Sequence, residues 1–225
     1  MIDDTDDTGY KEVFEAFYAH ANAEKAEGMC AYMRNLFPYL GIPTPLRRQL
    51  SKEFLKTARK AKAVDWDFIN TCWQQDKREF KYLAIDYLNV VLPLLCPKDI
   101  PKLKKLAVSK SWWDTIDGLD RIVGDIALRH PEVNKTLLTW SVHDNFWLRR
   151  ISIDHQLMRK DKTDTALLEE IILNNLGQKE FFINKAIGWS LREYSKTNPS
   201  WVRSFIDLHK GQMAPLSLRE GSKYL

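Results

Sequence analysis

The chain has 225 residues, 44% of them apolar, so it is long enough for one large domain or two small ones with a real hydrophobic core. Its formal charge of +4 includes four aspartates among the first seven residues; without them, 34 basic side chains face 26 acidic ones. This mild basic excess permits a polyanionic partner such as nucleic acid, although charge alone favours an ordinary solvated surface.

The cysteines Cys30, Cys72 and Cys96 are odd in number, lie far apart and have no C-x-x-C spacing. This pattern excludes a disulfide framework and a zinc or iron–sulfur site, so we expect reduced thiols, no metal and no cofactor. The acidic N-terminus is unlike a secretory signal, and the longest apolar run, 90–96, is much shorter than a bilayer span. The sequence therefore predicts a cytoplasmic monomer without a membrane partner.

Helical periodicity extends over almost the whole chain. We interpret residues 1–8 as an acidic flexible N-terminus and residues 9–225 as a single helical-repeat domain. Apolar residues at helical spacing predict two N-terminal helices, at 10–21 and 24–36. Within the second of these, Tyr32 is expected to be half-buried.

A third helix is predicted over 46–62, after a loop rich in proline and glycine. Thr44 is expected to be its N-cap, and Pro45 occupies the first helical position, where a missing N–H costs nothing. Arg47, Arg48 and five further cations make this the most basic stretch of the chain.

From residue 65 onward the sequence falls into helix pairs. The first members are expected at 65–75, 99–108, 132–142, 164–176 and 200–209. The second members open on aromatic residues at spacings of 32, 34 and 35, namely Phe80, Trp112, Phe146 and Phe181. Hairpins of this period cannot bury their apolar faces alone. The predicted fold is therefore all-α, an α-solenoid of stacked antiparallel helix pairs of the HEAT or armadillo type, with a concave basic groove.

Equivalent positions of the second helices become neighbours in such a stack. Trp113 and Asp117 share one helix face because they are four residues apart, whereas Trp112 is expected in the core. The set predicted to face one groove is Trp113, Asp117, Arg150, Lys185 and Trp189. Each residue alone has a structural explanation; Arg150, for example, could pair with Asp154 at i+4. Together, aromatic plates, a carboxylate and cations can pack a sugar, oppose a developing positive charge and hold phosphates.

The sequence lacks the motifs that other common classes of enzyme require. The sequence contains no G-x-S-x-G, H-E-x-x-H, Walker or G-x-G-x-x-G motif, and its five histidines have no Ser or Cys partner that spacing would assign.

Ordered strings over most of the chain carry a family resemblance. They are EKAE at 24–27, YMRN at 32–35, TPLRRQL at 44–50, KSWWDTID at 110–117, GDI at 124–126, HPE at 130–132, DNFWLRR at 144–150, KEFFINKAIGW at 179–189, LREY at 191–194 and KTNP at 196–199. In these strings the chain resembles the AlkD-type DNA alkylation repair glycosylases. It departs from them after Asp117, where Asp120 and Arg121 add charges to a stretch expected to be more apolar.

The resemblance implies a helical solenoid that binds duplex DNA and hydrolyses the N-glycosidic bond of N3- and N7-alkylated purines such as 3-methyladenine and 7-methylguanine, without an enclosing base pocket. It implies that Asp117 is the catalytic carboxylate, that Trp113 and Trp189 pack against the deoxyribose, and that Arg150 contacts lesion-strand phosphates. The other DNA-binding candidates are Tyr32, Thr44, Arg47, Arg48, Lys185 and Arg192.

Two rival functions remain open at this point. A catalytically inactive helical-repeat protein could bind DNA structure, with an affinity that falls steeply with salt. A protein-interaction scaffold could use the same surface without any preference for DNA.

Overall fold

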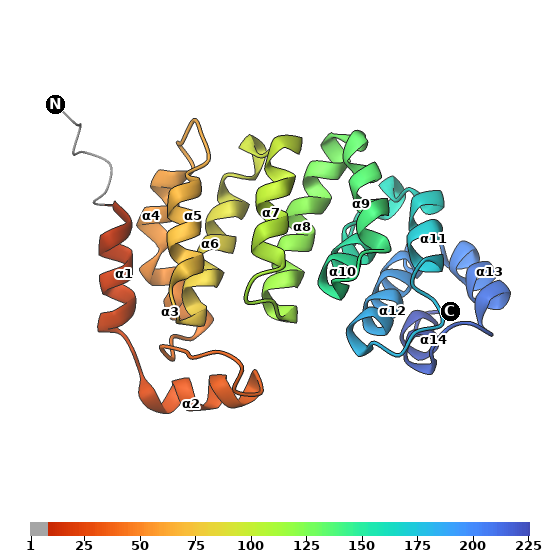
Figure 1. The fold of residues 1–225 in the computed structure, drawn as a ribbon, viewed down its shortest axis with the longest axis horizontal. Helices are drawn as coiled ribbons and strands as arrows, with labels where there is room; N and C mark the ends of the chain where they lie inside the picture. Colours follow the sequence, from red (N-terminus) through yellow and green to blue (C-terminus); the bar gives the residue numbers. More distant parts are fainter. Residues whose placement is uncertain (1–8) are drawn as a thin grey trace. The chain divides into compact units, whose positions relative to one another are not determined.

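The structure, a computed structural model, describes residues 9–225, and these fold into helices without a strand (Figure 1). The all-helical class predicted from the sequence is therefore confirmed, and the helix pairs are those of a helical repeat solenoid. The predicted acidic terminus, 1–8, lies outside the described residues. The chain divides into two compact units, Met1–Leu95 and Cys96–Leu225, so the single domain and the continuous concave groove stay predictions.

The first unit holds six α-helices and one short 3-10 helix, Leu92–Leu94, within its described residues. The α-helices are α1 (Gly9–Ala19), α2 (Ala23–Tyr32), α3 (Thr44–Leu50), α4 (Lys52–Ala58), α5 (Trp66–Gln74) and α6 (Arg78–Val90). Its core is aromatic: Phe80 of α6 is fully buried, and its ring centroid lies 4.5 Å from that of Phe14 and 5.5 Å from that of Phe17.

The basic third helix of the prediction is two helices, α3 and α4, separated at Ser51. The Ser51 hydroxyl donates to the Arg47 carbonyl at 2.9 Å, a bond to the preceding turn that bends helices. The cap is also shifted by one residue: Pro43 is the N-cap, and Thr44 begins the helix without a side-chain cap bond. The prediction of Thr44 as N-cap was therefore wrong.

The second unit holds eight α-helices. They are α7 (Ile100–Ala107), α8 (Trp113–Arg129), α9 (Asn134–Ser141), α10 (Phe146–Asp154), α11 (Thr165–Leu173), α12 (Phe181–Ser195), α13 (Pro199–His209) and α14 (Pro215–Gly221). The second members of successive pairs pack on one another, α8 on α10 and α10 on α12, and the first members α9 and α11 do the same. Between residues 9 and 225, no helix has the length and apolar content needed to cross a bilayer.

The predicted register of the aromatic residues holds only in part. Trp112 is the N-cap of α8, and its half-buried ring packs against those of Trp147 and Phe182 at 5.8 and 5.1 Å. Phe181, which the repeat aligns with Trp112, is 55% exposed. The next residue, Phe182, packs against the rings of Trp112, Phe146 and Trp147 and fills that place.

A glycine sets the distance between α8 and α10. A Cβ atom on Gly124 would lie 2.1 Å from the carbonyl oxygen of His155, the residue that caps α10. The Gly124 carbonyl in turn accepts a hydrogen bond from Arg159 Nη2 at 2.6 Å. This close approach of two backbones brings the side chains of α8 and α10 into contact further along the helices.

Candidate functional site

The centre of the site is an ion pair between α8 and α10. Arg150 Nε and Nη2 both donate to Asp117 Oδ1, at 2.9 and 2.8 Å. The remaining terminal nitrogen, Nη1, donates to the Phe182 carbonyl at 2.8 Å, so the guanidinium also holds the start of α12. The Arg150 side chain is 2% exposed, whereas that of Asp117 is 20% exposed. The carboxylate therefore reaches solvent and the arginine does not.

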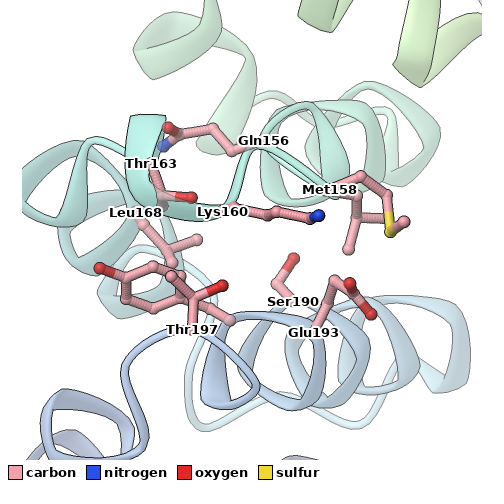
Figure 2. A pocket seen from close by; sticks show the side chains of 10 residues that line it. Gln156, Met158, Lys160, Thr163, Leu168, Ser190, Glu193 and Thr197 are labelled. Atoms are coloured by element: carbon pink, nitrogen blue, oxygen red, sulfur yellow. The ribbon is translucent and has the colours of Figure 1, made fainter.

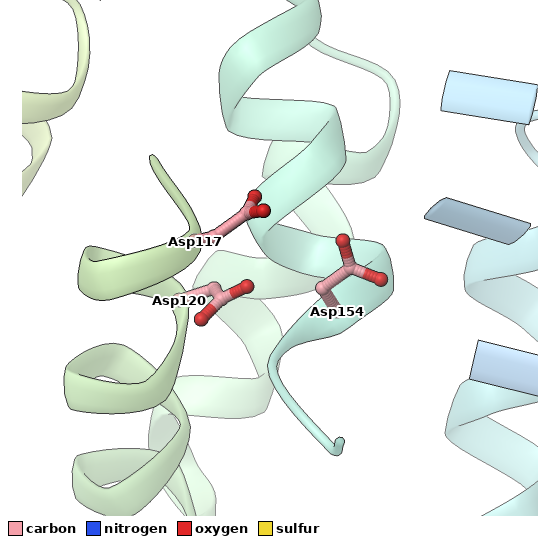
Figure 3. Close-up of side chains that lie close together, drawn as sticks. All are labelled: Asp117, Asp120 and Asp154. Carbon is pink, nitrogen blue, oxygen red and sulfur yellow. The ribbon is translucent and has the colours of Figure 1, made fainter. Parts of the chain in front are cut away.

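Two further carboxylates, those of Asp120 and Asp154, lie close to this ion pair. One oxygen from each of Asp117, Asp120 and Asp154 lies within 4.8 Å of the others, and the three side chains lie close together (Figure 3). Asp154 Oδ2 is 3.7 Å from Arg150 Nη2. Among the described residues, neither this oxygen nor Asp120 Oδ1 has a hydrogen-bond donor. Three carboxylates could hold a cation, and in this structure the Arg150 guanidinium fills that role.

Burial controls the protonation of the cluster. Burial raises the pKa of Asp117 although Arg150 opposes the shift. Burial and the repulsion of Asp154 raise the pKa of Asp120 well above its ordinary value. Burial also raises the pKa of Asp154 to about 7, against the attraction of Arg150. The three acids therefore differ in how readily they ionise, because only Asp117 keeps both solvent access and a close cation.

The two predicted tryptophans lie at the edges of this cluster. Trp113 is the first residue of α8, one turn before Asp117, and it is half-buried. Trp189, on α12, is also half-buried, and Arg150 Cζ lies 5.6 Å from its ring centroid. The structure thus brings Trp189 to the Asp117–Arg150 pair, as the repeat spacing predicted.

The predicted cations of α12 are paired with one acid of α14. Lys185 Nζ lies 3.0 Å from Glu220 Oε1, and Arg192 Nη1 lies 2.7 Å from Glu220 Oε2. Arg192 also lies over the Trp189 ring, at 5.9 Å. A hydrogen bond from Lys185 lowers the pKa of Glu220, which outweighs its partial burial. Both cations are therefore adjacent to Trp189, and an anionic side chain already sits between them.

Three of the predicted DNA contacts of the first unit share one cavity. Tyr32, Thr44 and Arg47 line a cavity of about 410 Å³ between α2 and α3. Arg47 is held there by Asp86 at 3.2 Å and lies over the Tyr82 ring at 4.9 Å. Tyr32 is 73% exposed, so the expectation that it is half-buried was wrong. Arg48 is exposed and does not line this cavity.

A small cavity lies behind the cluster, between the end of α10 and α12. Ser190, Glu193 and Met158 are among its lining residues (Figure 2), and its volume is about 10 Å³. That is room for about one water molecule, so this cavity cannot take a base. Ser190 connects it to the cluster, because its one hydroxyl proton is shared between two acceptors, the Ile153 carbonyl at 2.9 Å and Asp154 Oδ1 at 3.2 Å.

Sequence reasoning proposed Asp117 and Arg150 as site residues and Asp154 as a possible structural partner of Arg150, but it gave no functional role to Asp154, Ser190 or Glu220. Asp154 had a detectable signal, its i+4 spacing from Arg150, and the structure contains that pair together with the Asp117 pair. Ser190 could have been found as the neighbour of Trp189 on a packed helix. Glu220 had no signal, because the helix that carries it was not predicted.

Comparisons with known proteins show the family to which the chain belongs. The chain matches the sequence model of the family described as DNA alkylation repair enzyme over residues 13–225. It is also similar to a solved structure described as a predicted DNA alkylation repair enzyme from Enterococcus faecalis, at 37% sequence identity and a TM-score of 0.84. That match covers 91% of this chain and 96% of the other. No protein of curated function matches the chain.

Proposed function

Because the chain belongs to the family of DNA alkylation repair enzymes, we propose that it is a monofunctional DNA glycosylase that excises cationic N3- and N7-alkylated purines from duplex DNA. The observation that carries the proposal is the position of Asp117. It is the member of a three-carboxylate cluster that reaches solvent, at 20% exposure, while Asp120 and Asp154 are buried.

The chemistry of the lesion fits a site with one accessible carboxylate. An alkylated purine already carries positive charge, so it leaves as a neutral base with the electrons of the glycosidic bond and needs no general acid. Positive charge then develops on the sugar, and Asp117 stabilises it by charge. Water adds its oxygen to C1′ and loses a proton, which leaves an abasic site. Trp113 and Trp189 are the flat walls against which the deoxyribose packs.

DNA contacts follow from the cations around these residues. Lys185 and Arg192 are placed beside Trp189 and bind the phosphates nearest the lesion. In the first unit, the proposed contacts are Tyr32, Thr44, Arg47 and Arg48. A direct phosphate contact from Arg150 requires its guanidinium to leave Asp117 or Phe182, so we propose that it acts mainly by holding Asp117. Cytoplasmic location, a monomeric state and the lack of an enclosing base pocket stay predictions.

The test is release of base from methylated duplex DNA. We expect the purified protein to release 7-methylguanine or 3-methyladenine and Asp117→Asn to reduce the single-turnover rate about 10²- to 10³-fold, the scale of removing one electrostatic group. DNA affinity should stay within about twofold, because the phosphate contacts remain. The matched control is Asp125→Asn, on the same helix but in a surface pair with Arg129.

Other outcomes select the rival functions. Salt-dependent DNA binding without base release from any methylated substrate would indicate an inactive DNA-structure binder. Neither release nor DNA preference would indicate a protein-interaction scaffold. Full activity of Asp117→Asn would refute the catalytic role of this carboxylate while leaving glycosylase activity in place.

A further inference from the structure

The charges around Arg150 do not balance. Asp117, Asp120 and Asp154 meet one guanidinium, so three ionised carboxylates would leave a charge of −2 in a largely buried space. Asp120 and Asp154 are 2% and 1% exposed. Because a buried carboxylate without a cation or donors is strongly unfavourable, one of the three must keep its proton at neutral pH.

The hydrogen-bond partners indicate which acid keeps it. Asp154 has the Ser190 hydroxyl 3.2 Å from Oδ1 and Arg150 Nη2 3.7 Å from Oδ2. Asp120 Oδ1 and Asp154 Oδ2 both lack a hydrogen-bond partner among the described residues, but of these two acids only Asp154 forms an ion pair there, with Arg150. Partners of this kind stabilise the ionised form. Asp154 is therefore the acid that ionises, and Asp120 is the acid that stays neutral.

We propose that Asp154 is a positioning residue for base release: its ionised carboxylate is a second, buried counter-ion of Arg150 beside Asp117, so that the guanidinium does not fully cancel the negative charge that Asp117 offers to the sugar. The proposal rests on the proposed glycosylase function. With Asp120 neutral, Asp154 and Arg150 cancel, and the cluster keeps a net charge of −1 on its one solvent-accessible member. Without Asp154, the guanidinium that already binds Asp117 at 2.8 Å would balance the charge of Asp117 in full, and the site would oppose the developing cation weakly.

A pH dependence follows from the groups that face Asp154. These are Asp117 and Asp120 from α8, Arg150 from its own helix and the Ser190 hydroxyl from α12. The next residue, His155, stays neutral because burial lowers its pKa to about 3. Since the pKa of Asp154 is about 7, the rate of base release should rise with pH through this region as the counter-ion forms. An ordinary aspartate would have completed its titration far below it.

The experiment compares single-turnover base release from methylated duplex DNA between pH 5 and 9. We expect Asp154→Asn to be about 10- to 100-fold slower at pH 8, less than the loss of a group that contacts the sugar directly, and to lack the rise near pH 7. Its DNA affinity should be unchanged within about twofold. Ser190→Ala should move the rise to higher pH, because the hydroxyl that stabilises the ionised form is gone. Asp125→Asn should follow the wild type throughout.

A second measurement does not depend on activity or on the stability of a variant. Carboxyl ¹³C shifts of the wild-type protein should show Asp154 losing its proton at lower pH than Asp120. The inference is overturned if Asp120 ionises first, if Asp154→Asn keeps the wild-type rate and profile, or if Asp120→Asn reproduces the Asp154→Asn profile. Lack of base release by the wild type refutes the proposed function instead, and the order of ionisation still tests the counter-ion assignment.

Discussion

Each unit buries carboxylates, but the two units satisfy them in different ways. In the first unit, Glu79 is fully buried, and its two oxygens accept backbone N–H bonds of 2.9 to 3.2 Å from Leu40, Gly41 and Ile42. In the second unit, Asp120 and Asp154 are equally buried, yet each has an oxygen without a hydrogen-bond donor among the described residues.

The difference separates a structural acid from acids for which we propose a role in catalysis. The donors of Glu79 belong to a loop in which Gly41 adopts a φ of +86°, a conformation that suits glycine, so acid and loop fix one another. Nothing remains for Glu79 to bind. The second unit instead gathers three acids around Arg150, more negative charge than its donors satisfy. Such crowding is costly to stability and typical of functional sites.

Removal of the structural acid should give the largest effect. Glu79→Ala leaves three backbone N–H groups buried without an acceptor, and we expect a loss of about 4 kcal/mol in the free energy of unfolding. Urea denaturation measures it. As a control, Glu53→Ala removes a 75% exposed carboxylate that pairs with Lys56, and it should change stability by no more than about 0.5 kcal/mol. A loss below about 1 kcal/mol for Glu79→Ala would contradict the structural role.

The next largest effect tests how the crowded acids are brought together. Gly124→Ala places a Cβ 2.1 Å from the His155 carbonyl oxygen and must push α8 and α10 apart. We expect a loss of about 3 kcal/mol, at the upper end of overpacking effects, together with slower base release at temperatures where the variant is folded. Gly28→Ala is the matched control. A Cβ atom on Gly28, in α2, would have no atom within 4 Å apart from its own helix backbone and chain neighbours, so this change should stabilise the protein by about 0.5–1 kcal/mol. Equal stability of the two variants would contradict the close packing.

The sequence predicted the elements better than the contacts. Helix pairs and the neighbourhood of Asp117, Arg150 and Trp189 follow from a period of about 34 residues, because stacking places equivalent positions side by side. The break at Ser51 was missed, since the propensities on both sides favour helix and a single side-chain bond decides it.

The sequence also did not predict the ion pairs and hydrogen bonds that connect the site residues, for a related reason. Spacing places residues on a helix face but does not reveal that Arg150 bonds to Asp117, Asp154 and the Phe182 carbonyl at once. The pairing of Lys185 with Glu220 depends on α14, a helix of seven residues too short for a periodic signal. The functions assigned to these residues stay predictions.

The crowded acids should also make stability depend on pH. Asp154 has a pKa of about 7 in the folded protein against an ordinary value of 3.8, so its stabilising contribution is complete below about pH 4 and is lost as pH rises through 7. His155, with a folded pKa of about 3, makes stability rise with pH instead. The two effects partly cancel in the pH dependence of the wild-type stability. The difference in the free energy of unfolding between Asp154→Asn and wild type isolates the contribution of Asp154.

We expect the free energy of unfolding of Asp154→Asn, relative to that of the wild type, to increase by about 2 kcal/mol as the pH rises from 4 to 8. This is half of the ~4 kcal/mol that three pH units imply, because the neighbouring acids share the titration. Urea denaturation at several pH values checks it. If the difference in the free energy of unfolding between Asp154→Asn and wild type did not change with pH, Asp154 would have an ordinary pKa. The contrast between Glu79 and the crowded acids of the second unit would then be wrong.

The smallest effect concerns Glu220, an acid whose partners are the proposed phosphate-binding cations. Because the Glu220 carboxylate lies within 3.0 Å of Lys185 and 2.7 Å of Arg192, DNA phosphates must compete with it. Glu220→Gln should raise affinity for duplex DNA about threefold, roughly 0.6 kcal/mol, and steepen its salt dependence. Glu193→Gln makes the same charge change on α12, where the acid pairs with Lys196, and should raise affinity less. Equal gains would mean that only net charge matters, whereas a selective gain would show that Glu220 occupies the position of a phosphate.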